Sequence, residues 1–159
     1  MVDSSAATAT QRNTSRPVGV KVARTQALPT PTRPPESAEE LLAAADEARL
    51  SGRTAEGAAL LRKLLRLHRN DARAPLAAFT LGRMLLMELD RPMEAAAVFA
   101  EARRLATHGP LAEDSLAREV EALQQAGEMA LAKERAREYL RLYPDARRAA
   151  AVRMIVGIK

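Results

Sequence analysis

Cysteine and tryptophan are absent from this chain of 159 residues, and its four aromatic residues, two Tyr and two Phe, make up only 3% of it. Disulfides, thiol catalysis and cysteine-based zinc sites are therefore excluded. With so few rings, we expect neither base-stacking platforms nor aromatic cages. Leu, Ala and other aliphatic side chains must pack the interior of any folded domain.

Long apolar runs are also missing. None approaches the ~20 residues that a membrane-spanning helix needs, so we expect no transmembrane segment. The first residues lack the basic start and apolar core of a secretory signal. We therefore expect a cytoplasmic protein, with a periplasmic or membrane-tethered location as the alternative if the chain is a fragment of a longer protein.

Catalytic and metal-binding motifs are not found. The sequence has no Gly-rich phosphate loop, no G-x-S-x-G and no H-E-x-x-H pattern. Its two histidines, His68 and His108, lie far apart without ligand spacing, and we interpret His68 as a residue at the edge of the core. We expect no enzyme, no cofactor and no metal site.

Positive charge is concentrated at the N-terminus. Residues 1–36 contain five basic and two acidic residues, together with five of the nine prolines and many Ser and Thr. Such a segment buries too little surface to offset its ordering entropy. We predict a disordered basic linker over 1–36. Pro31 and Pro34 have the spacing of a PxxP ligand, but a linker is the favoured interpretation.

From Ser37 onward the pattern is helical. Ser37 and Glu40 form an S-x-x-E capping box, Gly52 ends the first helix, and Thr54 is expected to cap the second. We expect Asp71 to cap the third helix, with Pro75 in its first turn, and Pro92 to start the fourth. Breaks between helices are predicted at 108–110, Gly127 and Pro144, and Asp145 is expected to cap a last helix. Apolar positions recur at helical spacing and include Leu41, Leu61, Leu76, Phe99, Val120, Leu131 and Tyr139. We predict an all-α fold.

The breaks are periodic. Gly52, Asp90 and Gly127 end the first helix of each expected pair, 38 and 37 residues apart, and small residues follow five positions later at Gly57, Ala95 and Ala132. A fixed period of this length indicates stacked helical hairpins. We predict repeats at about 37–71, 72–109 and 110–144, followed by a capping helix at 145–156.

Two segments carry a family resemblance. "AFTLGRMLLMELDRPMEAAAVFAEA" (78–102) and "LAREVEALQQAGEMALAKERAREYLRLYP" (116–144) resemble tetratricopeptide repeats. Gly127 matches the turn glycine, Ala132 the small packing residue and Pro144 the terminal proline. The first unit departs from the pattern, with Gly57 for Ala, and the 37- and 38-residue spacings exceed the usual length of about 34.

The junction between the third hairpin and the last helix, "YLRLYPDARRAAAVR", is similar to such junctions in bacterial envelope proteins of this family. Examples are the outer-membrane-assembly lipoprotein type and the periplasmic division-coordinator type. Similar arrays also follow FecR-type signalling regions. The resemblance covers residues 37 to about 156. It implies a right-handed α-α superhelix, a solenoid of about three hairpins plus a capping helix. It also implies a non-catalytic scaffold that binds a partner peptide or helix, and it does not identify that partner.

In tetratricopeptide arrays the first helix of each pair lines a concave groove. Carried over from the glycine positions, the resemblance implies that the groove is lined by Leu42, Asp46 and Arg49 from the first pair, Phe79, Arg83, Leu86 and Met87 from the second, and Ala117, Glu121, Gln124 and Gln125 from the third. Arg49 and Arg83 can clamp a carboxylate, and Met87 can supply an apolar contact. The alternative for each is a solvated helix residue, or a core residue for Phe79, Leu86 and Met87.

A basic ridge is the other candidate surface. It consists of Arg62, Lys63, Arg66, Arg69 and Arg73, although Asp71 is expected to break the helix before Arg73. With the basic N-terminal segment, this ridge suggests an alternative function as a binder of nucleic acid or another anionic surface. The favoured interpretation is a solvated face whose arginine stems pack on leucines, because no groove-reading motif accompanies it. We do not expect nucleic acid as the partner, and the sequence leaves the oligomeric state open.

Overall fold

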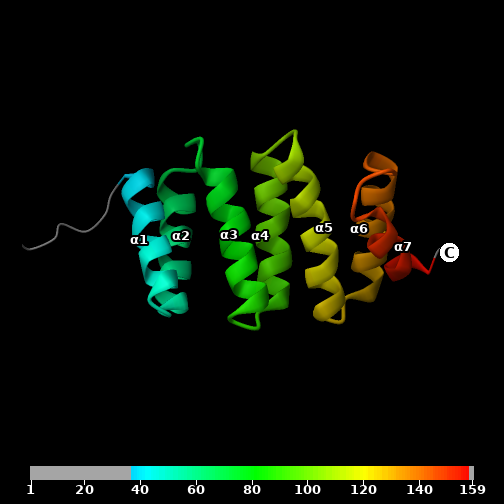
Figure 1. The fold of residues 1–159 in the computed structure, drawn as a ribbon, viewed down its shortest axis with the longest axis horizontal. Helices are drawn as coiled ribbons and strands as arrows, with labels where there is room; N and C mark the ends of the chain where they lie inside the picture. Colours follow the sequence, from blue (N-terminus) through cyan, green and yellow to red (C-terminus); the bar gives the residue numbers. More distant parts are fainter. Residues whose placement is uncertain (1–36, 158–159) are drawn as a thin grey trace, which may run out of the picture. The chain divides into compact units, whose positions relative to one another are not determined.

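The computed structural model describes residues 37–157, which form seven α-helices and no strand (Figure 1). The all-α prediction is therefore confirmed. The predicted linker at 1–36 and residues 158–159 lie outside the described residues. The helices are α1 Ala38–Leu50, α2 Thr54–Leu67, α3 Ala74–Met87, α4 Pro92–Leu105, α5 Pro110–Gln125, α6 Met129–Leu142 and α7 Ala149–Val156.

Helix starts follow the sequence where proline or a complete capping box marks them. The Ser37 backbone N–H donates to Glu40 Oε2 at 3.1 Å, and the Glu40 N–H donates to Ser37 Oγ at 3.2 Å. This reciprocal pair satisfies two amides that α1 leaves without intrahelical partners. Prolines occupy the first turns of α3, α4 and α5, where the missing N–H costs no hydrogen bond.

Three predicted side-chain caps are wrong. Thr54 lies inside α2, and its hydroxyl donates to Glu88 Oε2 at 2.9 Å. Asp145 precedes α7 by four residues, so Arg148 takes the cap position. Asp71 is two residues too early to cap α3; it accepts the Arg73 N–H at 2.8 Å, and this bond holds the pKa of Asp71 below its ordinary value of 3.8. In each case the helix begins at a different residue from the one that the polar side chain would cap.

The three periodic breaks share one backbone conformation. Gly52, Asp90 and Gly127 have φ of +74°, +51° and +80°, the left-handed region that ends helices. Among the described residues Asp90 is the only one other than glycine with a positive φ. The spacing of the breaks therefore reflects equivalent turns, and Asp90 stands where the other two turns have glycine.

Helix order repeats along the chain. The odd helices α1, α3 and α5 start at Ala38, Ala74 and Pro110, 36 residues apart in both steps, and the even helices α2, α4 and α6 start 38 and 37 residues apart. Each helix packs mainly on its neighbour in the chain, and α5 also contacts α3 and α7. In Figure 1 the described helices accordingly follow one another in a row.

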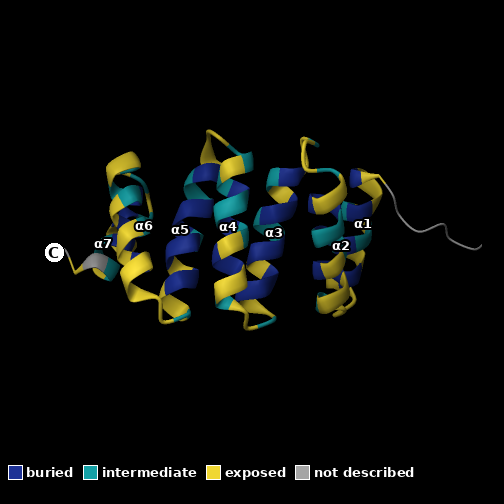
Figure 2. Cartoon of the chain, turned by 180° about the vertical axis from the view of Figure 1, so that it is seen from behind, coloured by how far each residue is buried: buried dark blue, intermediate teal, exposed yellow. Residues whose placement is uncertain are grey.

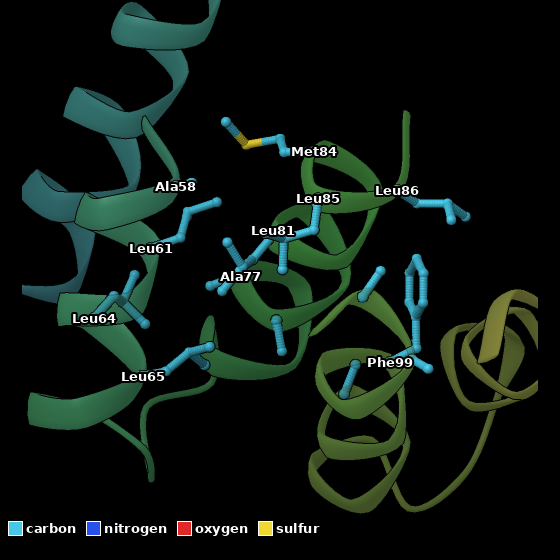
Figure 3. Close-up of a cluster of buried hydrophobic side chains, with 14 of the residues drawn as sticks. Ala58, Leu61, Leu64, Leu65, Ala77, Leu81, Met84, Leu85, Leu86 and Phe99 are labelled. Atoms are coloured by element: carbon cyan, nitrogen blue, oxygen red, sulfur yellow. The ribbon is translucent and has the colours of Figure 1, made fainter. Parts of the chain in front are cut away.

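The larger core cluster is mostly aliphatic and centred on α2, α3 and α4 (Figure 3). Phe99 of α4 is fully buried, and its ring meets Phe79 edge-on at a centroid distance of 5.7 Å. Gly82 of α3 lies directly against this ring: a Cβ built at Gly82 would be only 2.7 Å from Phe99 Cε1. The absence of a side chain at residue 82 is what lets α3 and α4 approach so closely.

A second core cluster joins α5, α6 and α7 around the fully buried Tyr139. Its hydroxyl donates to Glu113 Oε1 at 3.0 Å, and burial, together with this hydrogen bond, raises the pKa of Tyr139 to about 12. Figure 2 shows buried residues along α5, the helix that contributes to both clusters. Two predicted core positions, Leu76 and Leu131, are instead exposed.

None of the helices that the structure describes is both long and apolar enough to span a membrane.

Candidate functional site

A small cavity of about 150 Å³ lies between α1 and α3. Four of the predicted groove residues line it, Asp46 and Arg49 from α1 and Arg83 and Met87 from α3. Residues that are 34 or more positions apart in the sequence therefore meet at one site. The lining is completed by Thr80, Met84 and Glu88.

Charge in this cavity is only loosely paired. Arg49 Nη2 lies 3.8 Å from Asp46 Oδ1, a long ion pair between half-exposed side chains. Arg83 is exposed, and no ion pair of Arg83 is found among the described residues. Exposed pairs of this kind contribute little to stability, so both guanidinium groups can turn toward an incoming group at small cost.

A larger cavity, about 520 Å³, lies between α5 and α7. Three predicted groove residues of the third pair line it: Ala117, Glu121 and Gln124. Its apolar wall comes mostly from α7, through Ala151, Val152, Met154 and Ile155. The cavity thus combines an aliphatic wall with a polar rim, the usual composition of a site that holds one apolar side chain.

Two arginines at this rim already have carboxylate partners. Arg118 Nη1 lies 2.6 Å from Glu121 Oε2, and Arg148 Nε lies 3.2 Å from Asp114 Oδ1. The Nε–H of Arg118 is buried and donates to no acceptor in the described part of the chain. Arg118 is therefore held against α5 and frames the cavity rather than reaching away from it.

Four predicted groove residues line neither cavity. Leu86 is buried in the larger core cluster, and Phe79 and Leu42 are half-buried against it. These positions agree with the core alternative for Phe79 and Leu86. Gln125 is exposed as the last residue of α5. Met87, for which a core position was the other alternative, is exposed at 62%.

The sequence did not predict that α7 lines a cavity. The pattern gave α7 as an end cap, whereas four of its eight residues line the larger cavity. Helix spacing offered a signal, because α7 begins 39 residues after α5, close to the 36-residue steps between the earlier odd helices. Thr80 and Glu88 carried no signal, because helix periodicity alone does not say which polar residues face a neighbour.

The basic ridge is largely paired in the structure. Arg62 reaches Glu94 at 2.9 Å, Arg69 reaches Glu101 at 3.1 Å, and Arg73 reaches Glu39 at 2.9 Å. Because α2 ends at Leu67, Arg69 and Arg73 lie beyond the helix that carries Arg62, Lys63 and Arg66. The ridge is therefore not one continuous helical stripe, and its arginines link α2 to α4 and the start of α3 to α1.

A buried ion cluster at the junction of α4, α5 and α6 was not predicted. Glu119 of α5 is only 5% exposed, and its Oε1 lies 3.0 Å from Arg135 Nε of α6. Its Oε2 lies 3.5 Å from Arg103 Nε of α4, without hydrogen-bond geometry. Desolvation raises the pKa of Glu119 above its ordinary value of 4.5, although both arginines oppose this shift.

Both arginines of this cluster also bind Glu138 of α6, at 2.7 Å for Arg103 and 3.1 Å for Arg135. The four side chains form a closed network that ties three helices together. Its helix-bridging contacts indicate a structural role. In the described part of the chain no group of three acidic or histidine side chains is arranged to hold a metal ion.

The chain matches no protein-family model, and a comparison with curated proteins finds no match either.

Proposed function

We propose that this protein is a non-catalytic interaction scaffold of the tetratricopeptide type, in which the odd helices line a groove for a peptide or helix of a partner protein. The observation that carries the proposal is the convergence of groove residues in two cavities. Seven residues assigned to the groove from the family pattern line cavities beside α1, α3 and α5. A match of that kind is not expected from residues scattered over solvated faces.

The repeat geometry supports the same proposal. Equivalent left-handed turns at Gly52, Asp90 and Gly127, and odd helices that start 36 residues apart, are the features of a stacked array. We propose that the array is a right-handed superhelix with α7 as the first helix of an incomplete fourth pair. In such an array the groove continues from α1 to α7, and α7 is part of the binding surface as well as a cap.

The two cavities suggest how a partner is recognised. At the α1–α3 cavity, Arg49 and Arg83 can bind a carboxylate, because a guanidinium group donates two parallel hydrogen bonds to it. At the α5–α7 cavity, aliphatic walls around 520 Å³ suit a large apolar side chain. We therefore propose a partner segment with an acidic group toward α1 and an apolar residue toward α7.

Selection of random displayed peptides on the full chain tests this function. We expect enriched peptides to combine acidic and large apolar residues and to lose roughly tenfold or more of their affinity for the Arg49→Ala, Arg83→Ala double variant, which corresponds to about 1.4 kcal/mol. The matched control is Arg137→Ala, Arg141→Ala, which removes two exposed arginines from α6. Enriched peptides that bind both double variants equally well would contradict the groove assignment.

Salt dependence separates this function from the alternative anionic-surface binder. A binder that works through the basic ridge and the N-terminal segment would lose affinity steeply as salt rises, since each neutralised phosphate releases counterions. The proposed groove should show a weak dependence, because one carboxylate contact and one apolar contact carry the binding. The carboxylate partners of Arg62, Arg69 and Arg73 favour the groove.

A further inference from the structure

The two terminal helices of the described row carry its most exposed large apolar side chains. Leu50 of α1 is 79% exposed and Met154 of α7 is 81% exposed. The two helices lie at opposite ends of the row in Figure 1. Within the described residues α1 packs mainly on α2, and α7 packs on α6 and α5. Each end therefore has a helix face that the rest of the described chain does not cover.

The outer face of α1 carries acidic residues along its length and one large apolar residue, Leu50, at its C-terminal end. Ala38, Leu41, Ala45 and Ala48 form the buried side of the helix. At 3.6 residues per turn the opposite side carries Glu39, Ala43, Glu47 and Leu50, all exposed. From Ala38 to Leu50, four acidic residues stand against one arginine. Glu39 is the member of this face that also binds Arg73.

The end of the chain around α7 has the opposite charge. Ala149 and Val152 are buried, and the other side of α7 presents Ala150 and Met154. Four arginines and a single acidic residue lie between residues 141 and 156. Arg147, in the turn before α7, is exposed, and Arg153 within α7 is half-buried with its Nη2 on the Pro144 carbonyl at 2.8 Å.

Within the described residues α7 differs from the other odd helices in having no following helix that packs on it. The first three odd helices are each followed by an even helix that packs on them, α2 on α1, α4 on α3 and α6 on α5. No helix follows α7 in the part of the chain that the structure describes. An acidic helix with an exposed leucine at its C-terminal end, such as α1, matches α7 in both charge and apolar contact.

We propose that the outer face of α1 of a second copy of this chain docks on the outer face of α7, so that molecules associate end to end. Leu50 of one copy packs on Met154 and Ala150 of the other, and Glu39 and Glu47 face the arginines around α7. The contact is heterologous, because two different faces meet, and each complex leaves one face of each kind open. The α1 face is separate from the α1–α3 cavity, whereas Met154 on the α7 face also lines the α5–α7 cavity.

Sedimentation velocity of the full chain tests this contact. We expect the average mass to grow with protein concentration beyond that of a dimer, and to fall as salt screens the charges. Leu50→Glu and Met154→Glu should each abolish this growth, because each places a carboxylate in the apolar contact. Both side chains are exposed, so the variants should keep the helical circular dichroism of the parent. Leu76→Glu, at an exposed leucine of α3, is the matched control and should associate like the parent.

Mixing the two variants gives the decisive result. Leu50→Glu retains a complete α7 face and Met154→Glu retains a complete α1 face, so the mixture should form one-to-one dimers that do not grow further. Because Met154 also lines the α5–α7 cavity, the mixing experiment is repeated with Ala150→Glu, which lies outside that cavity. A full chain that stays monomeric at all concentrations, or a mixture that forms no dimer, would overturn the proposal. So would association that Leu50→Glu removes and Met154→Glu leaves intact, since that pattern indicates contact between two α1 faces.

Discussion

Asp90 is the residue at which the chain departs from its own repeat. Its φ of +51° lies in the left-handed region, where Gly52 and Gly127 end the equivalent helices. A residue with a Cβ loses about 1–2 kcal/mol in this conformation, and Asp is among those that tolerate it best. The fold therefore keeps a non-glycine residue here against a local backbone preference.

We predict that Asp90→Gly is more stable than Asp90→Ala by about 1 kcal/mol. Both variants lack the carboxylate and differ only in the Cβ, so their difference isolates the backbone term. Chemical denaturation measures it. At Ala59, an exposed position inside α2, replacement by glycine should have the reverse effect, a loss of about 1 kcal/mol. Equal stability of the two Asp90 variants would contradict a left-handed turn at this residue.

Gly82 is fixed by packing and not by backbone conformation. It lies within α3, where replacement by alanine would ordinarily stabilise the helix by about 1 kcal/mol. The added Cβ would lie 2.7 Å from the ring of Phe99, which is fully buried and cannot move away freely. Overpacking of this kind costs about 1–3 kcal/mol. We predict that Gly82→Ala destabilises the protein, as measured by its urea midpoint.

A double-variant cycle identifies the cause of that loss. Phe99→Leu alone should be destabilising because it removes a buried ring. Combined with Gly82→Ala, it frees the space that the new methyl group needs, so the double variant should lose less stability than the two single losses together. Strict additivity would show that the ring is not what opposes a Cβ at residue 82.

At the scale of elements, α5 carries the least expected feature, the buried carboxylate of Glu119. Desolvation raises its pKa in the folded protein above the ordinary value of 4.5. Between those two pKa values the folded protein binds a proton that the unfolded chain has released. The free energy of unfolding contributed by Glu119 therefore falls as pH rises through this window.

We predict that the stability of the parent relative to Glu119→Gln decreases as pH rises from below 4.5 to above the folded pKa. Urea unfolding at a series of pH values measures the difference. Glu121→Gln, at an exposed carboxylate of the same helix, controls for the loss of one charge. A relative stability of Glu119 that increases over the same range would mean that Arg103 and Arg135 outweigh the cost of burial.

Helix ends show which local signals are sufficient. The capping box at Ser37 and the prolines of α3, α4 and α5 predicted helix starts because they act through their own backbone geometry. Thr54 and Asp145 do not cap helices, because α2 begins at Thr54 itself and α7 begins four residues after Asp145. Thr54 instead binds Glu88, 34 residues away, a contact that local sequence does not contain.

At the scale of the whole molecule, the candidate groove is assembled from helices that are distant in sequence. The family pattern placed Asp46, Arg49, Arg83 and Met87 on one surface, and the structure brings them to one cavity. It did not distinguish Leu86, which is buried, from Met87, which is exposed. Adjacent residues of a helix differ by about 100° in direction, so a small error in register changes a groove residue into a core residue.

The sequence by itself determined the all-α class, the number and approximate limits of the helices and the period of the breaks. These follow from spacing along one chain: apolar positions at helical intervals, proline at helix starts, and glycine or its substitute at left-handed turns. Only the tertiary structure decided which polar residues pair, that α7 lines a cavity of about 520 Å³ beside α5, and that Glu119 is buried between two arginines. Those outcomes depend on how closely neighbouring helices approach each other. Between α3 and α4, for example, the approach depends on the lack of a side chain at Gly82, which lies against the ring of Phe99.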